Sequence, residues 1–123
     1  MGYELSVRTS FAAAHQLNGY DGVCENLHGH NWKVEVFIKA DRLNDIGIAL
    51  DFKVIKNKTN EILSLLDHKN LNQVPPFDKI NPSSENIARW LYQRLGEVLK
   101  LLDVKVSKVS VWETDNYCAS YSE

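Results

Sequence analysis

The segment His28-Gly29-His30 and the apolar residues that follow it at alternate positions constrain the fold more than any other feature. Side chains two residues apart project from the same face of a β-strand. The two histidines therefore share a face with the residues that continue their parity, namely Trp32, Val34, Val36 and Ile38. Two imidazoles beside a dry apolar wall can share one metal ion, and zinc suits such nitrogen ligands.

A strand is also predicted over residues 3–14, where apolar and polar residues alternate. Its apolar parity runs on into His15, which would end that strand. If this strand is the antiparallel neighbour of the one that runs from about His30 to Ala40, then His15, His28 and His30 converge. Three protein ligands with an open fourth position are typical of a catalytic zinc site. The alternative is that His-Gly-His is a turn with two exposed imidazoles.

Two helices are predicted between these strands and the end of the chain. Asp51 can cap a helix that begins at Phe52 and ends near residues 67–68. A stretch with all three prolines follows, and no helix or central strand should continue through it. The segment Pro82-Ser83-Ser84-Glu85 then starts a second helix. Its apolar stripe consists of Ile87, Leu91, Leu95, Val98 and Leu102.

The chain ends in two further predicted strands, over residues 105–113 and 117–121, joined by a turn. The valines of the first change parity between Val106 and Val109, which a β-bulge would explain. The order strand, strand, helix, helix, strand, strand indicates an α+β domain with a four-stranded antiparallel sheet and two helices on one face. Because open sheet edges aggregate unless they are paired, we expect subunits to join their sheets into a closed ring.

The composition fits a single soluble domain over residues 1–123, with 44% hydrophobic and 24% charged residues. A net charge of −2 gives no reason to expect nucleic acid or an anionic membrane as the main partner. The N-terminus has no signal-peptide pattern, so a cytoplasmic protein is expected. The chain has two cysteines, Cys24 and Cys118, and both are expected to be free thiols in the cytoplasm.

Three further features could carry chemistry. Cys24 stands four residues before His28, where a nearby cation would favour the thiolate, although isolated cysteines are commonly inert. Asp67 could orient His68 for proton transfer, or His68 could simply interact with the end of the helix. Glu113 continues the parity of Val109 and Val111, so it could face inward and accept two hydrogen bonds from the amidine edge of a pterin or guanine. It could equally be an exposed glutamate before a turn.

Taken together, these residues resemble the 6-pyruvoyltetrahydropterin synthase superfamily, and most closely its branch of 6-carboxy-5,6,7,8-tetrahydropterin synthases. Six segments in the same order carry the resemblance, and they span nearly the whole chain. They are Phe11-Ala12-Ala13-Ala14-His15, the Cys24 to His30 box, Asp51-Phe52, Leu66-Asp67-His68, Pro82-Ser83-Ser84-Glu85-Asn86 and Val111-Trp112-Glu113-Thr114.

The resemblance implies the tunnelling fold, in which three subunits form a barrel and two trimers stack into a hexamer. It implies Zn²⁺ on His15, His28 and His30, with Cys24, Asp67 and His68 as catalytic residues. It also implies that Glu113 anchors the pterin. The other substrate-binding residues that it suggests are Ser83, Ser84, Asp51 and Phe52. Because active sites in the family lie between subunits, Asp67 and His68 would serve a neighbouring chain's zinc.

The reaction implied is conversion of 7,8-dihydroneopterin triphosphate to 6-carboxy-5,6,7,8-tetrahydropterin, with release of acetaldehyde and triphosphate, on the route to queuosine and other 7-deazapurines. A pyruvoyl-forming synthase and a folate-branch enzyme that forms a 6-hydroxymethyl pterin are alternatives. In the folate branch a glutamate replaces the cysteine, so Glu25 is an alternative base to Cys24. A non-catalytic module that binds zinc or a purine-like ligand is the alternative from a different class.

Overall fold

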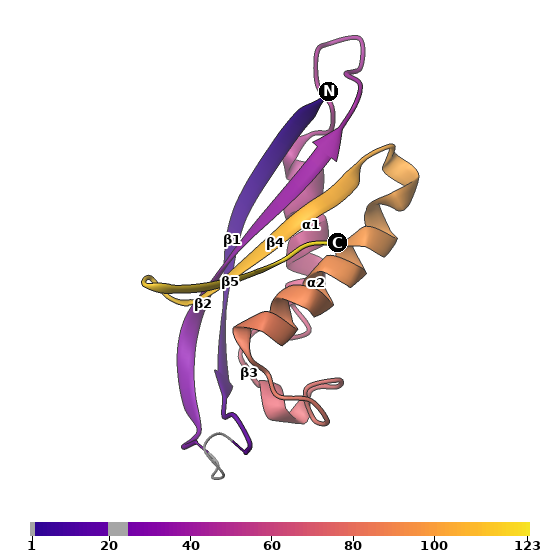
Figure 1. The fold of residues 1–123 in the computed structure, drawn as a ribbon. Helices are drawn as coiled ribbons and strands as arrows, with labels where there is room; N and C mark the ends of the chain where they lie inside the picture. Colours follow the sequence, from indigo (N-terminus) through magenta and orange to yellow (C-terminus); the bar gives the residue numbers. More distant parts are fainter. Residues whose placement is uncertain (1, 20–24) are drawn as a thin grey trace.

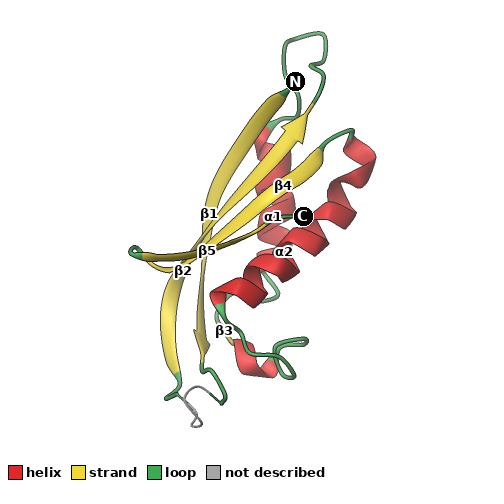
Figure 2. Cartoon of the chain, viewed as in Figure 1, coloured by secondary structure: helices red, strands yellow, loops and turns green. Residues whose placement is uncertain are grey.

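The structure is a computed structural model that describes residues 2–19 and 25–123. Both helices lie on one side of a single twisted sheet (Figures 1 and 2). The strands are β1 (Tyr3–His15), β2 (His28–Ala40), β3 (Lys69–Asn70), β4 (Lys105–Thr114) and β5 (Tyr117–Tyr121). The helices are α1 (Phe52–Leu63) and α2 (Ser84–Leu99), with short 3₁₀ turns η1 (Leu71–Gln73) and η2 (Lys100–Leu102). The predicted α+β class is therefore confirmed.

The sheet has five strands in the order β3-β1-β2-β4-β5, so the predicted four-stranded antiparallel sheet is wrong in one respect. The additional strand β3 pairs in parallel with β1 at Ala13 and Ala14, which makes the sheet mixed. Two residues are too short for an alternating pattern, and this is why the sequence carried no signal for β3. β3 ends before the first proline, Pro75, because proline has no N–H to donate to a neighbouring strand.

The pairing of β1 with β2 is antiparallel and uninterrupted from Tyr3–Ala40 to His15–His28. The predicted alternation is confirmed, since Trp32, Val34, Val36 and Ile38 are all at most 1% exposed. β2 starts at His28, two residues earlier than predicted. The predicted bulge is also confirmed, because the register between β2 and β4 shifts where Ser107 is passed over.

Side-chain caps fix where both helices begin. The Asp51 carboxylate accepts a hydrogen bond from the Lys53 N–H at 2.8 Å, and the Ser83 hydroxyl accepts one from the Asn86 N–H at 3.1 Å. α1 ends at Leu63 rather than near residues 67–68. Tight turns replace the helix beyond that residue, and His68 adopts a left-handed backbone with φ 59°. This turn carries the chain back to the edge of β1.

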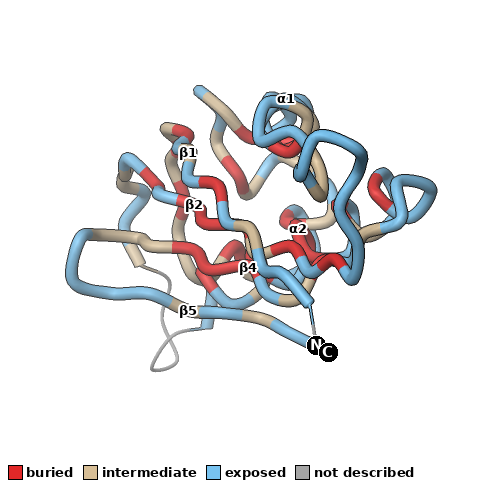
Figure 3. Tube along the Cα trace, turned by 90° about the horizontal axis from the view of Figure 1, so that it is seen from above, coloured by how far each residue is buried: buried red, intermediate tan, exposed pale blue. Residues whose placement is uncertain are grey.

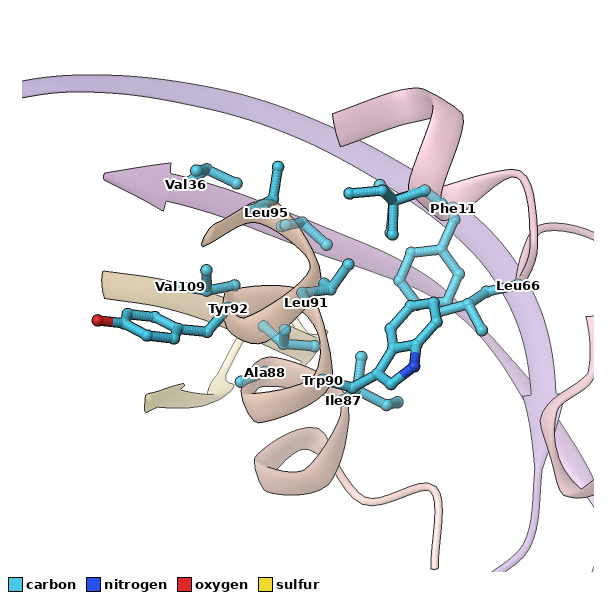
Figure 4. Packing of buried hydrophobic residues seen from close by; sticks show 14 of the residues in the cluster. Phe11, Val36, Leu66, Ile87, Ala88, Trp90, Leu91, Tyr92, Leu95 and Val109 are labelled. Atoms are coloured by element: carbon cyan, nitrogen blue, oxygen red, sulfur yellow. The ribbon is translucent and has the colours of Figure 1, made fainter. Parts of the chain in front are cut away.

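The core lies between the helices and the inner face of the sheet (Figure 3). Leu91 and Leu95 of α2 are fully buried and lie close to Val36 and Val109 (Figure 4). Burying one such leucine contributes about 1.5–3 kcal/mol. The predicted stripe of α2 holds as far as Leu95, but it continues at the buried Leu99 rather than at Val98, which is exposed. Leu102 is also exposed, because the helix has already given way to the 3₁₀ turn η2. In the described part of the chain, no helix has the length and apolar character to cross a membrane.

Candidate metal centre

The end of β1 and the start of β2 bring three histidines together. The register places His15 opposite His28 and Ala13 opposite His30, so all three imidazoles lie on the helix-facing side. Ring centroids are 4.7 Å apart for His15–His28 and His28–His30, and 5.3 Å apart for His15–His30. One candidate ligand atom from each ring, together with a carboxylate oxygen of Glu113, lies within 4.8 Å of the others. The predicted convergence of the three histidines is confirmed.

Backbone carbonyl groups orient two of the imidazoles through Nδ1. His15 Nδ1 lies 2.8 Å from the Pro82 carbonyl oxygen, and His28 Nδ1 lies 2.7 Å from that of Asn26. A carbonyl oxygen only accepts, so each Nδ1 carries the proton and each Nε2 keeps its lone pair. Metal-bound histidines are commonly oriented by such bonds. Sequence reasoning missed both carbonyls, and the Pro82 one is 67 residues away along the chain.

The outward ring nitrogens fit a metal ion. Within the described part of the chain, Nε2 of His15 and of His30 are buried side-chain atoms without a hydrogen-bond partner. A buried polar atom without a partner is costly, and a coordinated cation would satisfy both nitrogens at once. Burial lowers the pKa of His15 below its ordinary value of 6.5, which keeps the ring neutral and able to ligate. The donor set suits a borderline-soft first-row divalent ion.

Glu113 is the fourth member of the cluster. Its Oε1 atom is 3.0 Å from His30 Nε2 and 3.8 Å from His15 Nε2. The shorter contact has the length of a hydrogen bond, but its angle is unsuitable, so His30 Nε2 has no hydrogen-bond partner among the described residues. The Glu113 side chain is 32% exposed, against 1% for that of His15. A carboxylate in this place can approach either a metal ion or a ligand that enters from solvent.

Asp67 and His68 form a pair that brackets the backbone of Ala12. The Asp67 Oδ1 atom accepts the Ala12 N–H at 2.9 Å, and the His68 N–H donates to the Ala12 carbonyl at 2.6 Å. The other Asp67 oxygen lies 3.0 Å from His68 Nδ1. The hydrogen bond from the Ala12 N–H, followed by the interaction with His68, lowers the pKa of Asp67 below its ordinary 3.8. Asp67 is therefore an anion at neutral pH that fixes the His68 ring.

This pair is not part of the histidine cluster of its own chain. The His68 side chain is 82% exposed and lines a groove of about 480 Å³. The other residues that line this groove are Ala12, Ala13, Ala14, Gly29, His30, Asn31 and Lys69. Asp67 and His68 bond to the Ala12 backbone on the side of β1 away from β2, directly before β3, so the pair lies at the outer edge of β1. The sequence placed Asp67 and His68 next to each other but gave no information on which face they occupy.

The other predicted substrate-binding residues are also separated within one chain. Asp51 and Phe52 line a groove of about 350 Å³ with Tyr3 and Leu5, at the start of β1. From Leu5 to His15 the strand covers roughly 33 Å at about 3.3 Å per residue. The Ser83 hydroxyl caps α2 and Ser84 is buried, directly after the Pro82 carbonyl that holds His15. Ser83 and Ser84 thus lie near the cluster, whereas Asp51 and Phe52 lie at the far end of β1.

Cys24 lies outside the described residues. Its neighbour Glu25 is described, and its carboxylate accepts the Leu17 N–H at 3.2 Å while its own N–H donates to the Leu17 carbonyl at 3.0 Å. Glu25 thus pairs with Leu17 much as a residue in an antiparallel strand would. This engagement reduces the availability of its carboxylate as a base.

Comparison with known proteins assigns the chain to a family. The sequence profile of the family named 6-pyruvoyl tetrahydropterin synthase matches residues 4–123. The chain belongs to this family. A 6-pyruvoyl tetrahydropterin synthase from Caenorhabditis elegans has the same fold, with a TM-score of 0.85 over 100% of this chain and 96% of that one, at 24% identity.

Curated members of the pterin synthase family carry different activities in their names. The chain is 38% identical over 93 residues to a 6-carboxy-5,6,7,8-tetrahydropterin synthase from Synechocystis, covering 72% of this chain and 70% of that protein. It is 34% identical over 110 residues to a dihydroneopterin monophosphate aldolase from Pyrococcus furiosus, covering 89% of each. The family is therefore one of enzymes that act on pterins, and the individual reaction differs among its members.

The four histidines of the chain allow a matched test of the metal centre. We expect the wild-type protein to bind one first-row divalent ion per chain. His30→Ala removes a ligand and should weaken binding by more than the roughly 10–100-fold that outer-shell changes cost. His68→Ala removes an exposed imidazole outside the cluster and should leave the metal affinity unchanged. Chelator competition with zinc or cobalt measures both affinities, and equal losses in the two variants would contradict this site.

Proposed function

We propose that this protein is a zinc-dependent 6-carboxy-5,6,7,8-tetrahydropterin synthase. It would convert 7,8-dihydroneopterin triphosphate and one water molecule to the 6-carboxy product with release of acetaldehyde and triphosphate, on the route to queuosine and related 7-deazapurines. The observation that carries the proposal is the convergence of His15, His28 and His30 in a chain of the pterin synthase family. In His15 and His28 a backbone carbonyl contacts Nδ1, which leaves Nε2 available to a metal ion. The identity to the Synechocystis enzyme supports the choice of branch.

In this proposal the three histidines hold Zn²⁺ through nitrogen atoms on the helix-facing side of β1 and β2. When bound, the ion supplies Lewis acidity, which lowers the pKa of a substrate hydroxyl group that approaches it. The wall beside the cluster is apolar, since the rings of His15 and His30 lie edge-on to that of the buried Trp32. Excluding water from this side strengthens electrostatic interactions at the site.

Proton transfer is assigned to Cys24 and to the Asp67–His68 pair. Cys24 as a thiolate would remove a proton from the substrate side chain, as the resemblance implies. The engagement of the Glu25 carboxylate with Leu17 supports Cys24 over Glu25 as the base. His68, whose Nδ1 faces the Asp67 carboxylate, presents Nε2 to return or accept a proton.

Glu113 is proposed to anchor the pterin ring. A carboxylate has two oxygens that can accept two N–H groups from the amidine edge of the ring. Its partial exposure and its position beside His30 support this role, because a ring held there would bring its side chain next to the histidines. This positioning is the contribution that orientation makes to the rate.

We also propose a homo-oligomer, the hexamer of two stacked trimers, and the division of the site within one chain supports it. Asp67 and His68 lie at the outer edge of β1 and are not among the clustered residues of their own chain, which supports their assignment to the site of a neighbouring subunit. Asp51 and Phe52 are assigned to a neighbour's site because they lie beside Tyr3 and Leu5, at the far end of β1 from the cluster. Two sheet edges have no strand partner in the described chain. They are the outer edge of β5 and the part of the outer edge of β1 that β3 does not cover, and they could join subunits into a barrel.

The uncovered face of the sheet has the polar character that the inside of such a barrel needs. Arg8 Nε lies 3.3 Å from the Glu35 carboxylate, and the Ser110 and Ser120 hydroxyls are hydrogen-bonded at 2.6 Å. A groove of about 470 Å³ on this face is lined in part by Arg8, Lys33 and Asp115. These groups can remain hydrated in a channel.

An aldolase is the second candidate, because the relative from Pyrococcus furiosus covers 89% of the chain at 34% identity. A pyruvoyl-forming synthase is a third possibility within the same family. Both would use the same histidines. A module that binds zinc or a purine-like ligand without turnover would need neither Cys24 nor the Asp67–His68 pair.

Product identification separates these functions. Incubation of the zinc-loaded protein with 7,8-dihydroneopterin triphosphate should yield 6-carboxy-5,6,7,8-tetrahydropterin together with acetaldehyde, detected by mass spectrometry and by an aldehyde assay. A 6-pyruvoyl product without acetaldehyde would assign the chain to the pyruvoyl branch. A 6-hydroxymethyl pterin, formed from the triphosphate or from dihydroneopterin monophosphate, would make it an aldolase. Absence of turnover with all of these substrates would favour the binding module.

Replacing each base candidate tests the role of Cys24. Cys24→Ala should lower kcat by about 10²–10⁴-fold, the usual contribution of a general base, while leaving zinc content intact. Glu25→Gln keeps an oxygen that can accept the Leu17 N–H, so this matched variant should retain near wild-type activity. Activity that survives the first change and is lost in the second would transfer the role to Glu25.

The role of Glu113 is tested by removing its charge at constant shape. Hydrogen bonds to charged groups contribute about 1.5–3 kcal/mol, so Glu113→Gln should weaken pterin binding by roughly 10- to 100-fold. Zinc affinity should change little, because the anchoring role does not require the carboxylate to ligate the metal. Isothermal titration with the pterin and chelator competition for zinc measure the two effects separately. A large loss of zinc affinity with unchanged pterin binding would make Glu113 a fourth metal ligand instead.

A further inference from the structure

The loop that follows His15 is held by asparagine side chains from a distant part of the sequence. Asn72 accepts the Gln16 N–H through Oδ1 and donates to the Gln16 carbonyl through Nδ2, both at 2.9 Å. Asn81 does the same for Asn18, at 2.8 Å for the accepted bond and 2.9 Å for the donated one. Each asparagine therefore pairs with a backbone residue through two hydrogen bonds, as a neighbouring strand would.

The Asn81 pairing differs from the Asn72 pairing because Asn81 adjoins a residue that contacts His15. Asn81 directly precedes Pro82, whose carbonyl oxygen lies 2.8 Å from Nδ1 of His15. The two segments are thus joined twice, by the His15 ring to Pro82 and by the Asn18 backbone to Asn81. The Asn81 carbonyl also accepts Nδ2 of Asn86 at 2.8 Å, which ties it to the first turn of α2. Asn81 therefore links the loop after β1 to the helix start that supplies the Pro82 carbonyl.

From this geometry we infer that Asn81 is a positioning residue for the metal centre. It fixes the Pro82 carbonyl opposite His15, which selects the tautomer of His15 with the proton on Nδ1 and the lone pair on Nε2. The ring is 1% exposed, so the Pro82 carbonyl rather than solvent is the acceptor that orients it. The inference rests on the proposed role of His15 as a metal ligand. It adds a residue 66 positions further along the chain that controls the ligand through a backbone carbonyl.

Asn72 provides a stringent control for this inference. Both asparagines are partly buried, both make two hydrogen bonds to the same loop, and Gln16 is even closer in sequence to His15 than Asn18 is. Only Asn81 adjoins the carbonyl that His15 contacts. If support of the loop were all that mattered, replacing either residue would weaken metal binding equally.

The test compares zinc and cobalt affinity of the full-length wild type with that of Asn81→Ala and Asn72→Ala. Loss of an outer-shell partner typically lowers metal affinity by about 10–100-fold. We expect Asn81→Ala to fall in that range and Asn72→Ala to bind close to wild type, although thermal unfolding should show both to be destabilised. The cobalt absorption spectrum of Asn81→Ala should also change, since it reports ligand geometry around the ion.

A second variant covers the case in which Asn81→Ala fails to fold. Asn81→Asp keeps the oxygen that accepts the Asn18 N–H but places a second, acceptor-only oxygen against the Asn18 carbonyl, so it should also lower the metal affinity. Equal losses in the Asn72 and Asn81 variants, or an unchanged affinity in every Asn81 variant that folds, would overturn the inference. If the wild type binds neither zinc nor cobalt, the proposed function itself fails, which is a distinguishable result.

Discussion

The antiparallel pairing of β1 with β2 is the constraint on which the rest of the structure depends. Its register sets His15 opposite His28, and side-chain alternation then puts His30 on the same face. A slip of one residue would move every one of these side chains to the opposite face. The apolar residues further along both strands prevent that slip, since Val7, Val34 and Val36 would leave the core with them. The hydrophobic core and the metal centre are therefore specified by the same hydrogen-bonded pairing.

Strand pairing brings the rings together, but it does not decide which nitrogen each ring presents. That decision comes from acceptors outside the two strands, namely the carbonyls of Pro82 and Asn26. The Pro82 carbonyl comes from the residue before the N-cap of α2, so the capping of that helix by Ser83 and the orientation of His15 are parts of one local structure. In this light Ser83 and Ser84 have a structural use that is independent of any contact with substrate.

Features with local sequence signals could be predicted, and features made by long-range contacts could not. The alternation around Trp32, the caps at Asp51 and Ser83, and the valine parity change all depend on neighbours within a few residues, and each was predicted correctly. β3 and the early end of α1 arise where the chain meets the edge of β1, through the bonds of Asp67 and His68 to Ala12. The spacing of residues in the sequence does not predict such long-range contacts. The proximity of Glu113 to the histidines likewise depends on where β4 lies beside β2, although its inward parity was visible.

Under the proposed function, the separation of the Asp67–His68 pair from the histidine cluster is the reason that the site would need more than one chain. The proposed proton relay needs an imidazole that reaches solvent and substrate, and the exposed His68 meets that need, whereas the buried His15 is kept dry and oriented as the proposed metal site needs. Within one chain the two groups are separate, because His68 lies at the outer edge of β1 and is not one of the clustered residues. Association of subunits through the edges of β1 and β5 is a way to bring the exposed face of one chain to the histidine cluster of another. The oligomer would then be a condition for catalysis rather than a later addition to a complete monomer.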